Sequence, residues 1–272
     1  MRRGRFVESY APSIVAGDAS DRIGRPDLAY STWVNIAGAA MAAGEYERAL
    51  EFLDRGSAAI AGRGLKGIEA DVLAARAFVL RSLGRLEDAR CAAEAEEAVA
   101  EQIGHPEMLA MASHDRGMVA LEQGDWDLAA ELLGSALDHK ARISRPVTRI
   151  ALAEALARGG RPDEAAEEVR AVVLEPVRPS DFPATLVPRL ARVQGLIAHA
   201  RADDDEAVLR LEESVSGWER LLAANLRADS LTGVLADLGR PVVGLVEPER
   251  ELARARADLQ AIQEGRSSAV IP

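Results

Sequence analysis

The sequence predicts an all-α protein that is built from repeated pairs of antiparallel helices. Three observations carry this prediction. Apolar residues recur at helical spacing over long stretches, for example at Leu73, Ala74, Ala77 and Leu80. Val, Ile and Thr never alternate with polar residues over the length of a strand. Finally, a glycine followed two positions later by a large residue, and three after that by alanine, returns about every 40 residues.

This third pattern divides the chain into copies of similar length. The marker position is occupied by Gly44, Gly84, Gly124, Gly160, Ala202 and Gly239. Five residues after the marker stand Ala49, Ala89, Ala129, Ala165, Ala207 and Gly244. A single helix pair cannot bury both of its apolar sides, so the copies are expected to stack on one another. Small residues are then needed where helices cross, and a helix breaker is needed where the chain reverses.

These positions resemble the tetratricopeptide repeat (TPR), and the resemblance covers almost the whole chain. It implies a right-handed superhelical TPR solenoid of antiparallel helix pairs, in which the marker glycine joins helix A to helix B. The period is longer than the family's period of about 34 residues, and we attribute the difference to longer B helices and loops. Long-period repeats of this kind resemble the C-terminal sensor solenoids of large ATP-dependent bacterial transcription activators of the maltose-regulator and LuxR type.

The repeat phase fixes the expected elements in order. A half repeat over residues 1–25 should contain a lone B helix at about residues 5–19. One solenoid domain over residues 1–264 should then hold repeats at about 26–65, 66–104, 105–144, 145–179, 180–223 and 224–264. Prolines fall in the expected first turns of helices, at Pro26, Pro106, Pro146, Pro162 and Pro188. Pro248 should begin a final capping helix to about Glu264, and residues 265–272 should form a flexible tail.

Composition excludes several classes of partner. The net charge of −11 is too acidic for a protein that binds nucleic acid directly. No apolar run is long enough to cross a membrane, and the N-terminal residues lack the pattern of a secretory signal. One cysteine, Cys91, fits a reducing compartment. The preference for Arg over Lys, with much Ala and Gly, is typical of a GC-rich bacterial genome. We therefore expect a cytoplasmic bacterial protein.

Motifs for catalysis or for cofactors are not found in the sequence. The segment "GRGLKG" (62–67) lacks the spacing of a phosphate-binding loop, and no Cys or His pair has the spacing of zinc ligands. The acidic run "DDDE" (203–206) is interpreted as the start of a B helix, where carboxylates oppose the helix dipole. Cys91 is expected to be a buried structural thiol. These observations predict a protein that is not an enzyme and uses no cofactor or metal.

Function is then expected on the surface. The resemblance implies that A helices line the concave side of the superhelix, and it places Glu154 and Arg158 among the inward positions. The residues proposed from these positions as ligand candidates are Asn35, Phe78, Arg81, His114, Met118, Arg189, Arg192 and His199. Asn35 stands in "WVNIAG", similar to the family's peptide-binding signature, but no other repeat has Asn there. That absence counts against a long peptide held by its main chain.

Two alternatives remain open for these candidates. Phe78 and Met118 either pack between neighbouring A helices or form the apolar floor of a ligand groove. Arg189, Arg192 and His199 either create a positive field for an acidic ligand or pair with Glu154 or Asp229 of adjacent helices.

Two functions follow from the resemblance. The first is a non-catalytic module that binds a protein segment or peptide in its concave groove. The second is the effector-sensing, regulatory solenoid of a bacterial transcription regulator, detached from its ATPase and DNA-binding domains, whose ligand is a small acidic effector. The lone first B helix also predicts an uncovered N-terminal edge at which an upstream ATPase domain or a partner chain would dock.

Overall fold

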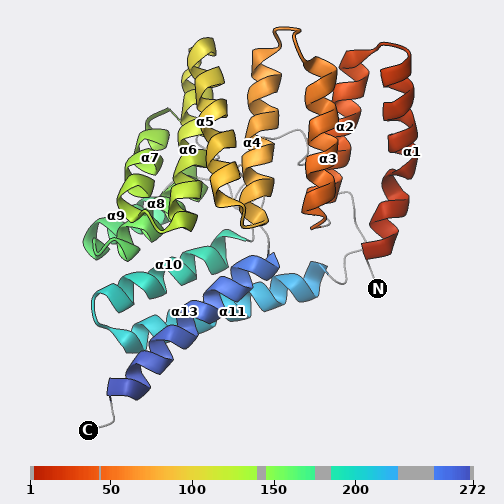
Figure 1. Ribbon diagram of the computed structural model, residues 1–272. Helices are drawn as coiled ribbons and strands as arrows, with labels where there is room; N and C mark the ends of the chain where they lie inside the picture. The colour runs from red at the N-terminus through yellow and green to blue at the C-terminus, as the bar shows by residue number, and fades with distance from the viewer. Residues whose placement is uncertain (1–2, 43, 140–144, 175–184, 226–247, 270–272) are drawn as a thin grey trace. The chain divides into compact units, whose positions relative to one another are not determined.

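A computed structural model of the chain describes residues 3–42, 44–139, 145–174, 185–225 and 248–269. Every regular element in these ranges is an α-helix, and no strand occurs among them (Figure 1). The contacts between helices divide the described chain into two compact units, one ending at Glu122 and the other starting at Gln123. We call them unit 1 and unit 2. No helix in the described ranges is long and apolar enough to cross a bilayer.

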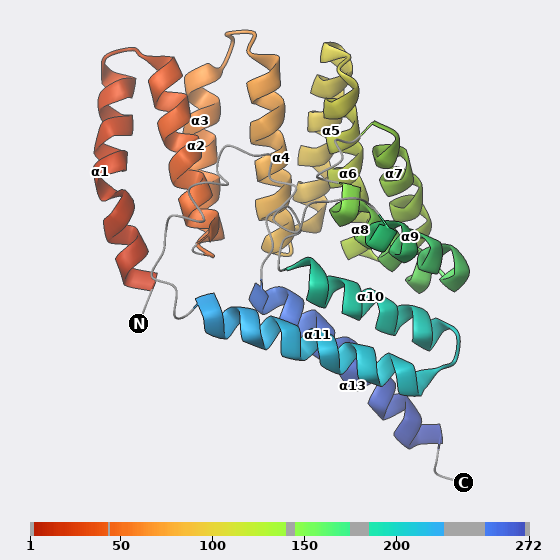
Figure 2. The same ribbon diagram turned by 180° about the vertical axis from the view of Figure 1, so that it is seen from behind.

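Unit 1 is a row of helices that pack in sequence order. Its elements are α1 (Arg3–Arg22), α2 (Pro26–Ala42), α3 (Tyr46–Ile60), α4 (Lys66–Ser82), α5 (Leu86–Ile103) and α6 (Pro106–Gln123). Helices α2 and α3 form one antiparallel pair and α4 and α5 form the next, and α3 packs against α4 (Figure 2). Helix α1 packs against α2, as expected for a half repeat.

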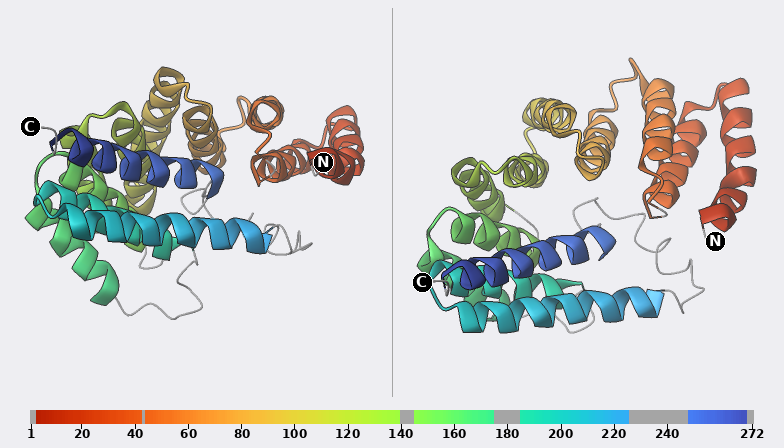
Figure 3. Two further views of the ribbon diagram at one scale, coloured as in Figure 1. Left: turned by 90° about the horizontal axis from the view of Figure 1, so that it is seen from below. Right: turned by 60° about the horizontal axis from the view of Figure 1, so that its bottom comes forward.

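Unit 2 continues the alternation and adds a last helix. Its elements are α7 (Trp126–His139), α8 (Arg145–Arg158), α9 (Pro162–Leu174), α10 (Leu186–Ala200), α11 (Asp204–Asn225) and α13 (Pro248–Ala269). Helices α8 and α9 form one pair and α10 and α11 form the next, while α10 also packs against α8. Helix α13 lies along α11 (Figure 3).

The turns confirm the repeat phase predicted from the sequence. In the described repeats the B helices begin two residues after the marker, at Tyr46, Leu86, Trp126, Pro162 and Asp204. The backbone angle φ is positive at the markers, with values of 72° at Gly44, 74° at Gly84, 81° at Gly124, 76° at Gly160 and 61° at Ala202. A side chain is disfavoured in this left-handed conformation, which explains why the marker is usually glycine.

Two backbone hydrogen bonds close four of these turns in the same way. In the first repeat the N–H of Gly44 donates to the carbonyl of Met41 at 3.0 Å, and that of Glu45 donates to Ala40 at 2.8 Å. The same pair of bonds closes the turns at Gly84, Gly160 and Ala202. The last carbonyls of each A helix are satisfied by this arrangement.

Small residues stand where paired helices cross, as predicted. The alanines five residues after the described markers are fully buried. At Gly195 of α10, an added Cβ would lie 2.8 Å from Cγ of Leu211 and 3.1 Å from the carbonyl oxygen of Ala207. The approach of α10 to α11 is therefore set by backbone contact, and a methyl group does not fit between them.

Three expectations differ from the structure or lie outside it. Cys91 is exposed rather than buried, because its neighbours Ala92 and Ala93 occupy the inner side of α5. Helix α13 begins at Pro248 as predicted but continues past Glu264 to Ala269, so the expected tail starts inside a helix. The first part of repeat six, with Asp229 and Gly239, lies outside the described residues, and the single solenoid over residues 1–264 stays a prediction.

Candidate functional site

The apolar candidates of unit 1 are packed into the protein. Phe78 of α4 and Met118 of α6 are buried. The ring of Phe78 meets that of Tyr46 edge to face, with their centroids 6.5 Å apart. Of the two alternatives, this geometry agrees with packing for Phe78 and does not show an open apolar floor. His114 of α6 is also buried.

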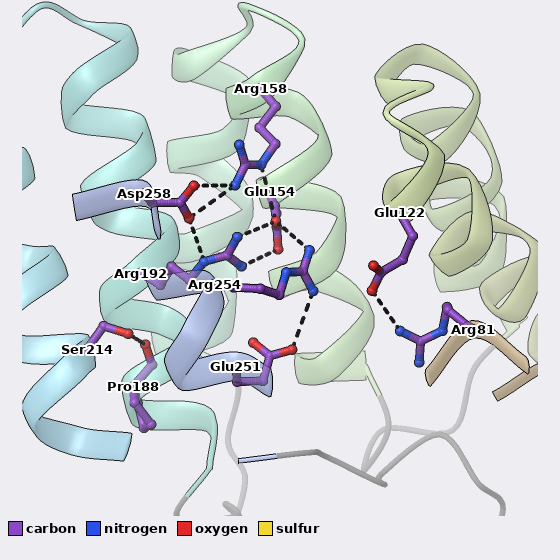
Figure 4. Close-up of polar contacts among 10 residues, drawn as sticks. All are labelled: Arg81, Glu122, Glu154, Arg158, Pro188, Arg192, Ser214, Glu251, Arg254 and Asp258. Atoms are coloured by element: carbon purple, nitrogen blue, oxygen red, sulfur yellow. Dashed lines mark hydrogen bonds and ion pairs between the residues drawn. The ribbon is translucent and has the colours of Figure 1, made fainter. Parts of the chain in front are cut away.

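Arg81 joins two A helices of unit 1. Its guanidinium pairs with the carboxylate of Glu122 on α6 at 3.0 Å (Figure 4). The same guanidinium lies 5.4 Å from the ring centre of Phe78. Both side chains of the pair are largely shielded from water. Arg81 therefore already has a carboxylate partner inside unit 1.

Exposed polar groups remain at the other inward positions of unit 1. Asn35 of α2 and Asp71 of α4 are both exposed. Burial, and then the charge of Asp71, raise the pKa of the nearby Tyr30 hydroxyl to about 12. Partial burial also raises the pKa of Asp71 above its ordinary value. These groups form the accessible part of what we call the inward face of unit 1, the inward positions of α2, α4 and α6.

In unit 2, Arg192 occupies the centre of a buried ion-pair network. Its side chain on α10 is 3 % exposed. The two Nη atoms donate to the two carboxylate oxygens of Glu154 on α8, each at 3.0 Å, and Nε donates to Asp258 on α13 at 2.8 Å (Figure 4). The structure therefore shows the ion-pair alternative for Arg192, with Glu154 as predicted and with Asp258 as a second partner.

Further arginines complete the network. Glu154 also accepts hydrogen bonds from Arg158 of α8 at 3.3 Å and from Arg254 of α13 at 3.2 Å. Arg158 donates to both carboxylate oxygens of Asp258, at 2.8 and 3.1 Å. Arg254 additionally pairs with Glu251 within α13 at 3.5 Å. The positive and negative charges of the network are equal in number, so it has no net charge that would attract an acidic ligand.

The network holds its charges over a wide pH range. Burial alone raises the pKa of Glu154, but the surrounding guanidiniums, first Arg192, outweigh burial and hold the pKa well below its usual range. Burial lowers the pKa of Arg192, whereas the facing carboxylates, first Glu154, raise it above its usual range. A general acid or base needs a pKa near the working pH. The network is therefore suited to holding helices together rather than to transferring protons.

Apolar contacts seat α13 beside the same network. Leu252 and Ala255 form a buried cluster with Trp218 of α11. Further along α13, Ile262 packs against Ala207 and Leu211. These apolar contacts hold α13 mainly against α11, whereas its ion pairs join it to α8 and α10, whose inward positions we call the inward face of unit 2.

The remaining basic candidates do not join Arg192 in one field. Arg189 is buried on α10. His199 is exposed near the turn to α11, where its Nδ1 lies 2.7 Å from a carboxylate oxygen of Asp204. The three groups therefore do not act together as the basic end of a groove, because Arg192 is neutralised by its own ion pairs and His199 lies beside Asp204.

A shallow open groove of about 580 Å³ lies between α3, α4 and α5 in unit 1. Its lining includes Glu47, Glu51 and the exposed Cys91. Other lining charges are paired with each other, as in the contact of Arg85 with Asp88 at 2.8 Å. No group of His, Cys, Asp or Glu in the described part of the chain has an arrangement that would hold a metal ion.

Comparison with known proteins adds to this geometry. A tetratricopeptide-repeat family model matches residues 120–179. The fold is that of a TPR solenoid. This match falls on helices whose marker turns and buried alanines follow the same rule as the repeats outside the matched range. No curated protein is similar enough to the chain to be called a relative.

Several solved structures are similar to this chain. BtubC (BKLC) from P. vanneervenii has a TM-score of 0.58 and 13 % identity, over 85 % of this chain and 94 % of that chain. YrrB, described as a TPR protein with an unusual peptide-binding site, has a TM-score of 0.43 and 18 % identity, over 72 % and 90 %. A tetratricopeptide repeat protein from Parabacteroides merdae has a TM-score of 0.37 and 14 % identity, over 86 % and 96 %. At such identities the first likeness concerns the fold alone, and the two lower scores mark only a general similarity.

Sequence reasoning missed the contribution of α13 to the site. A capping helix was predicted there, but no role was assigned to Arg254 or Asp258. Their spacing of four residues places them on one face of the helix, one turn apart. The signal that was available is this charged pair beside an apolar stripe of Leu252, Ala255 and Ile262 in a terminal helix.

Proposed function

We propose that the protein is a non-catalytic module that binds a segment of another protein on the inward faces of its A helices. One observation carries the proposal. The inward face of unit 2 binds a helix of the chain itself, α13, through ion pairs, while apolar contacts with α11 support the same helix. Recognition of a helix by a complementary surface is a common mode of protein binding. The TPR fold supports the proposal, because a repeat scaffold presents a long surface without a catalytic centre.

The inward face of unit 1 offers a second surface with different chemistry. The amide of Asn35 can both donate to and accept from a peptide main chain. Asp71 as a residue is exposed, and partial burial of its carboxylate raises the pKa above its ordinary value. We propose that a bound segment places a basic side chain at Asp71 and main-chain groups at Asn35.

A regulatory, effector-sensing role is the second proposal, and it has weaker support. In this hypothesis, the solenoid senses a small acidic effector and acts together with an ATPase domain and a DNA-binding domain. That ligand needs a positive group, and Arg192 is already paired with Glu154 and Asp258. The exposed thiol of Cys91 fits a reducing compartment, which supports a place in the cytoplasm for either proposal.

Peptide selection tests the proposal directly. A library of displayed peptides is selected on the full chain, and the retained peptides are titrated against wild type and an Asn35→Ala/Asp71→Lys variant. For peptides whose basic residue contacts Asp71, we expect the variant to bind at least tenfold more weakly than wild type, which corresponds to about 1.4 kcal/mol. Glu131→Lys, on the exposed outer side of α7, is the matched control and should leave binding unchanged. Peptides that bind both variants equally well would remove the inward face of unit 1 from the function.

A further inference from the structure

We infer that Glu154, Arg158 and Arg192 form a helix-recognition site, that α13 is its built-in occupant, and that a partner helix carrying Arg and Asp four residues apart competes for it. This inference rests on the proposed function and names the partner class for the inward face of unit 2. The partner is recognised by the order of its charges together with an apolar stripe on the same side.

The order of charges is read by direct contacts. Arg254 of α13 donates to Glu154 at 3.2 Å, and Asp258, one turn later, accepts from Arg192 at 2.8 Å. A helix with the reverse order would bring a carboxylate to Glu154 and a guanidinium to Arg192 and Arg158. Like charges at such distances are strongly unfavourable in a buried site, so a helix that runs in the direction of α13 must carry Arg before Asp.

The receiving side of the site is complete without α13. Arg192 and Glu154 make two parallel hydrogen bonds between α10 and α8, and Arg158 contacts Glu154 within α8. These three side chains alone carry a net charge of one positive unit. A carboxylate such as that of Asp258 therefore supplies the missing charge, and Arg254 brings Glu251 with it as its own partner.

The apolar part of the seat is imperfectly matched by α13. Trp218 of α11 is fully buried against Leu252 and Ala255. Its indole Nε1 is buried and has no hydrogen-bond partner within the described ranges of the chain. A buried donor without an acceptor lowers the net stability of the complex that covers it. A partner helix that offers a hydroxyl or amide oxygen to this N–H has an advantage over α13.

Competition by a peptide copy of α13 tests the inference. The probe is a fluorescent synthetic peptide of residues 248–269, titrated by anisotropy against the full chain. In wild type the internal helix is present at high effective concentration and should exclude the probe. In a chain carrying Arg254→Glu and Asp258→Arg, the internal helix mispairs while the receiving residues are unchanged. We expect this chain to bind the probe at least tenfold more tightly than wild type does.

Two controls distinguish recognition of the charges from nonspecific binding of the probe. Arg256→Glu alters an exposed residue of α13 that pairs with Glu219 outside the network, and this chain should behave as wild type. A probe carrying both Arg254→Glu and Asp258→Arg should not bind the charge-reversed chain. Equal binding of both probes to that chain, or binding of neither while circular dichroism shows it folded, would overturn the inference.

A folding defect does not remove the test. If the charge-reversed chain is unfolded, the single Arg254→Gln variant is used, which keeps Arg192 paired with Glu154 and Asp258. It should bind the probe more tightly than wild type, and no gain would overturn the inference. Failure of the peptide selection on unit 1 would count against the proposed function there and leave the result with this defined probe unaffected.

Discussion

The inward faces of the two units use corresponding helix positions in different ways. In unit 2 these positions carry Glu154, Arg158 and Arg192, and a helix of the same chain closes over them. In unit 1 the ion pair between Arg81 and Glu122 joins neighbouring A helices. The difference shows that a constant repeat frame can present a closed charge network or an accessible polar surface. A few side chains decide which of the two is formed.

The largest expected effect is a difference in stability between variants of the two inward faces. Glu154→Gln removes the carboxylate that faces three guanidiniums and should lower the free energy of unfolding by about 3–5 kcal/mol. Arg81→Gln removes a single cation from unit 1, and its effect should be smaller. Both are measured by urea unfolding at neutral pH.

A surface pair provides the matched control for these variants. Arg90 contacts Glu87 and Glu94 on the exposed side of α5, and Arg90→Gln should be nearly neutral. If Arg81→Gln or Arg90→Gln costs as much as Glu154→Gln, the buried network is not what distinguishes the two units.

The next effect tests whether close packing or charge sets the position of α10. Gly195→Ala places a methyl group against Leu211 and should lower the free energy of unfolding by about 1–3 kcal/mol. Gly134 of α7 has no neighbouring atom within 4 Å of such a methyl group. Gly134→Ala should therefore stabilise the protein by about 0.5–1 kcal/mol, since alanine favours the helix. Similar melting temperatures for the two variants would contradict the close approach of α10 and α11.

Lowering the pH should weaken the contribution of Glu154 to stability in unit 2 and should relieve the destabilising effect of ionised Asp71 in unit 1. The pKa of Glu154 is depressed, so its contribution to stability is present above its ordinary value of 4.5 and is lost as pH falls toward the folded-state pKa. The pKa of Asp71 is raised, so its ionised form opposes folding at neutral pH and protonation relieves this cost. Urea midpoints across the acidic range should show the destabilisation by Glu154→Gln shrinking as pH falls. The small gain from Asp71→Asn should shrink in the same direction, and a gain that grows in acid would contradict the sign for Asp71.

The sequence predicted the fold well because its signals are local. The marker residue, its left-handed turn and the buried alanine five positions later all lie within one short segment, and even Ala202 adopts the marker's conformation. Neighbouring A helices also follow from the repeat phase, which made Glu154 a predicted alternative partner for Arg192. The contact of Arg192 with Asp258 joins residues 66 positions apart. No periodicity indicates that a terminal helix returns to that face, and the exposed position of Cys91 was missed because a helix turns by about 100° between neighbours.

The smallest effect gives an optical measure of the accessible face in unit 1. Burial, and then the charge of Asp71, raise the pKa of Tyr30 to about 12. Because the pKa of Tyr30 is raised in the folded state, the contribution of Tyr30 to stability is fully present below the ordinary value of 10.0. This contribution is lost as the pH rises through the folded-state pKa. Ultraviolet titration of the phenolates should show a tyrosine that ionises late, and Tyr30→Phe should remove it. Asp71→Asn should lower the pKa of Tyr30, whereas Glu69→Gln, which alters a carboxylate paired with Lys66, should not.

The same titration reports occupancy of the proposed peptide surface. A basic side chain seated at Asp71 neutralises the charge that raises the pKa of Tyr30, so a bound peptide should lower this pKa, as Asp71→Asn does. A neutral peptide of equal length is the control, since burial without a cation raises the pKa of the phenol instead. A selected peptide that binds tightly and leaves the titration of Tyr30 unchanged must contact a surface other than the inward face of unit 1.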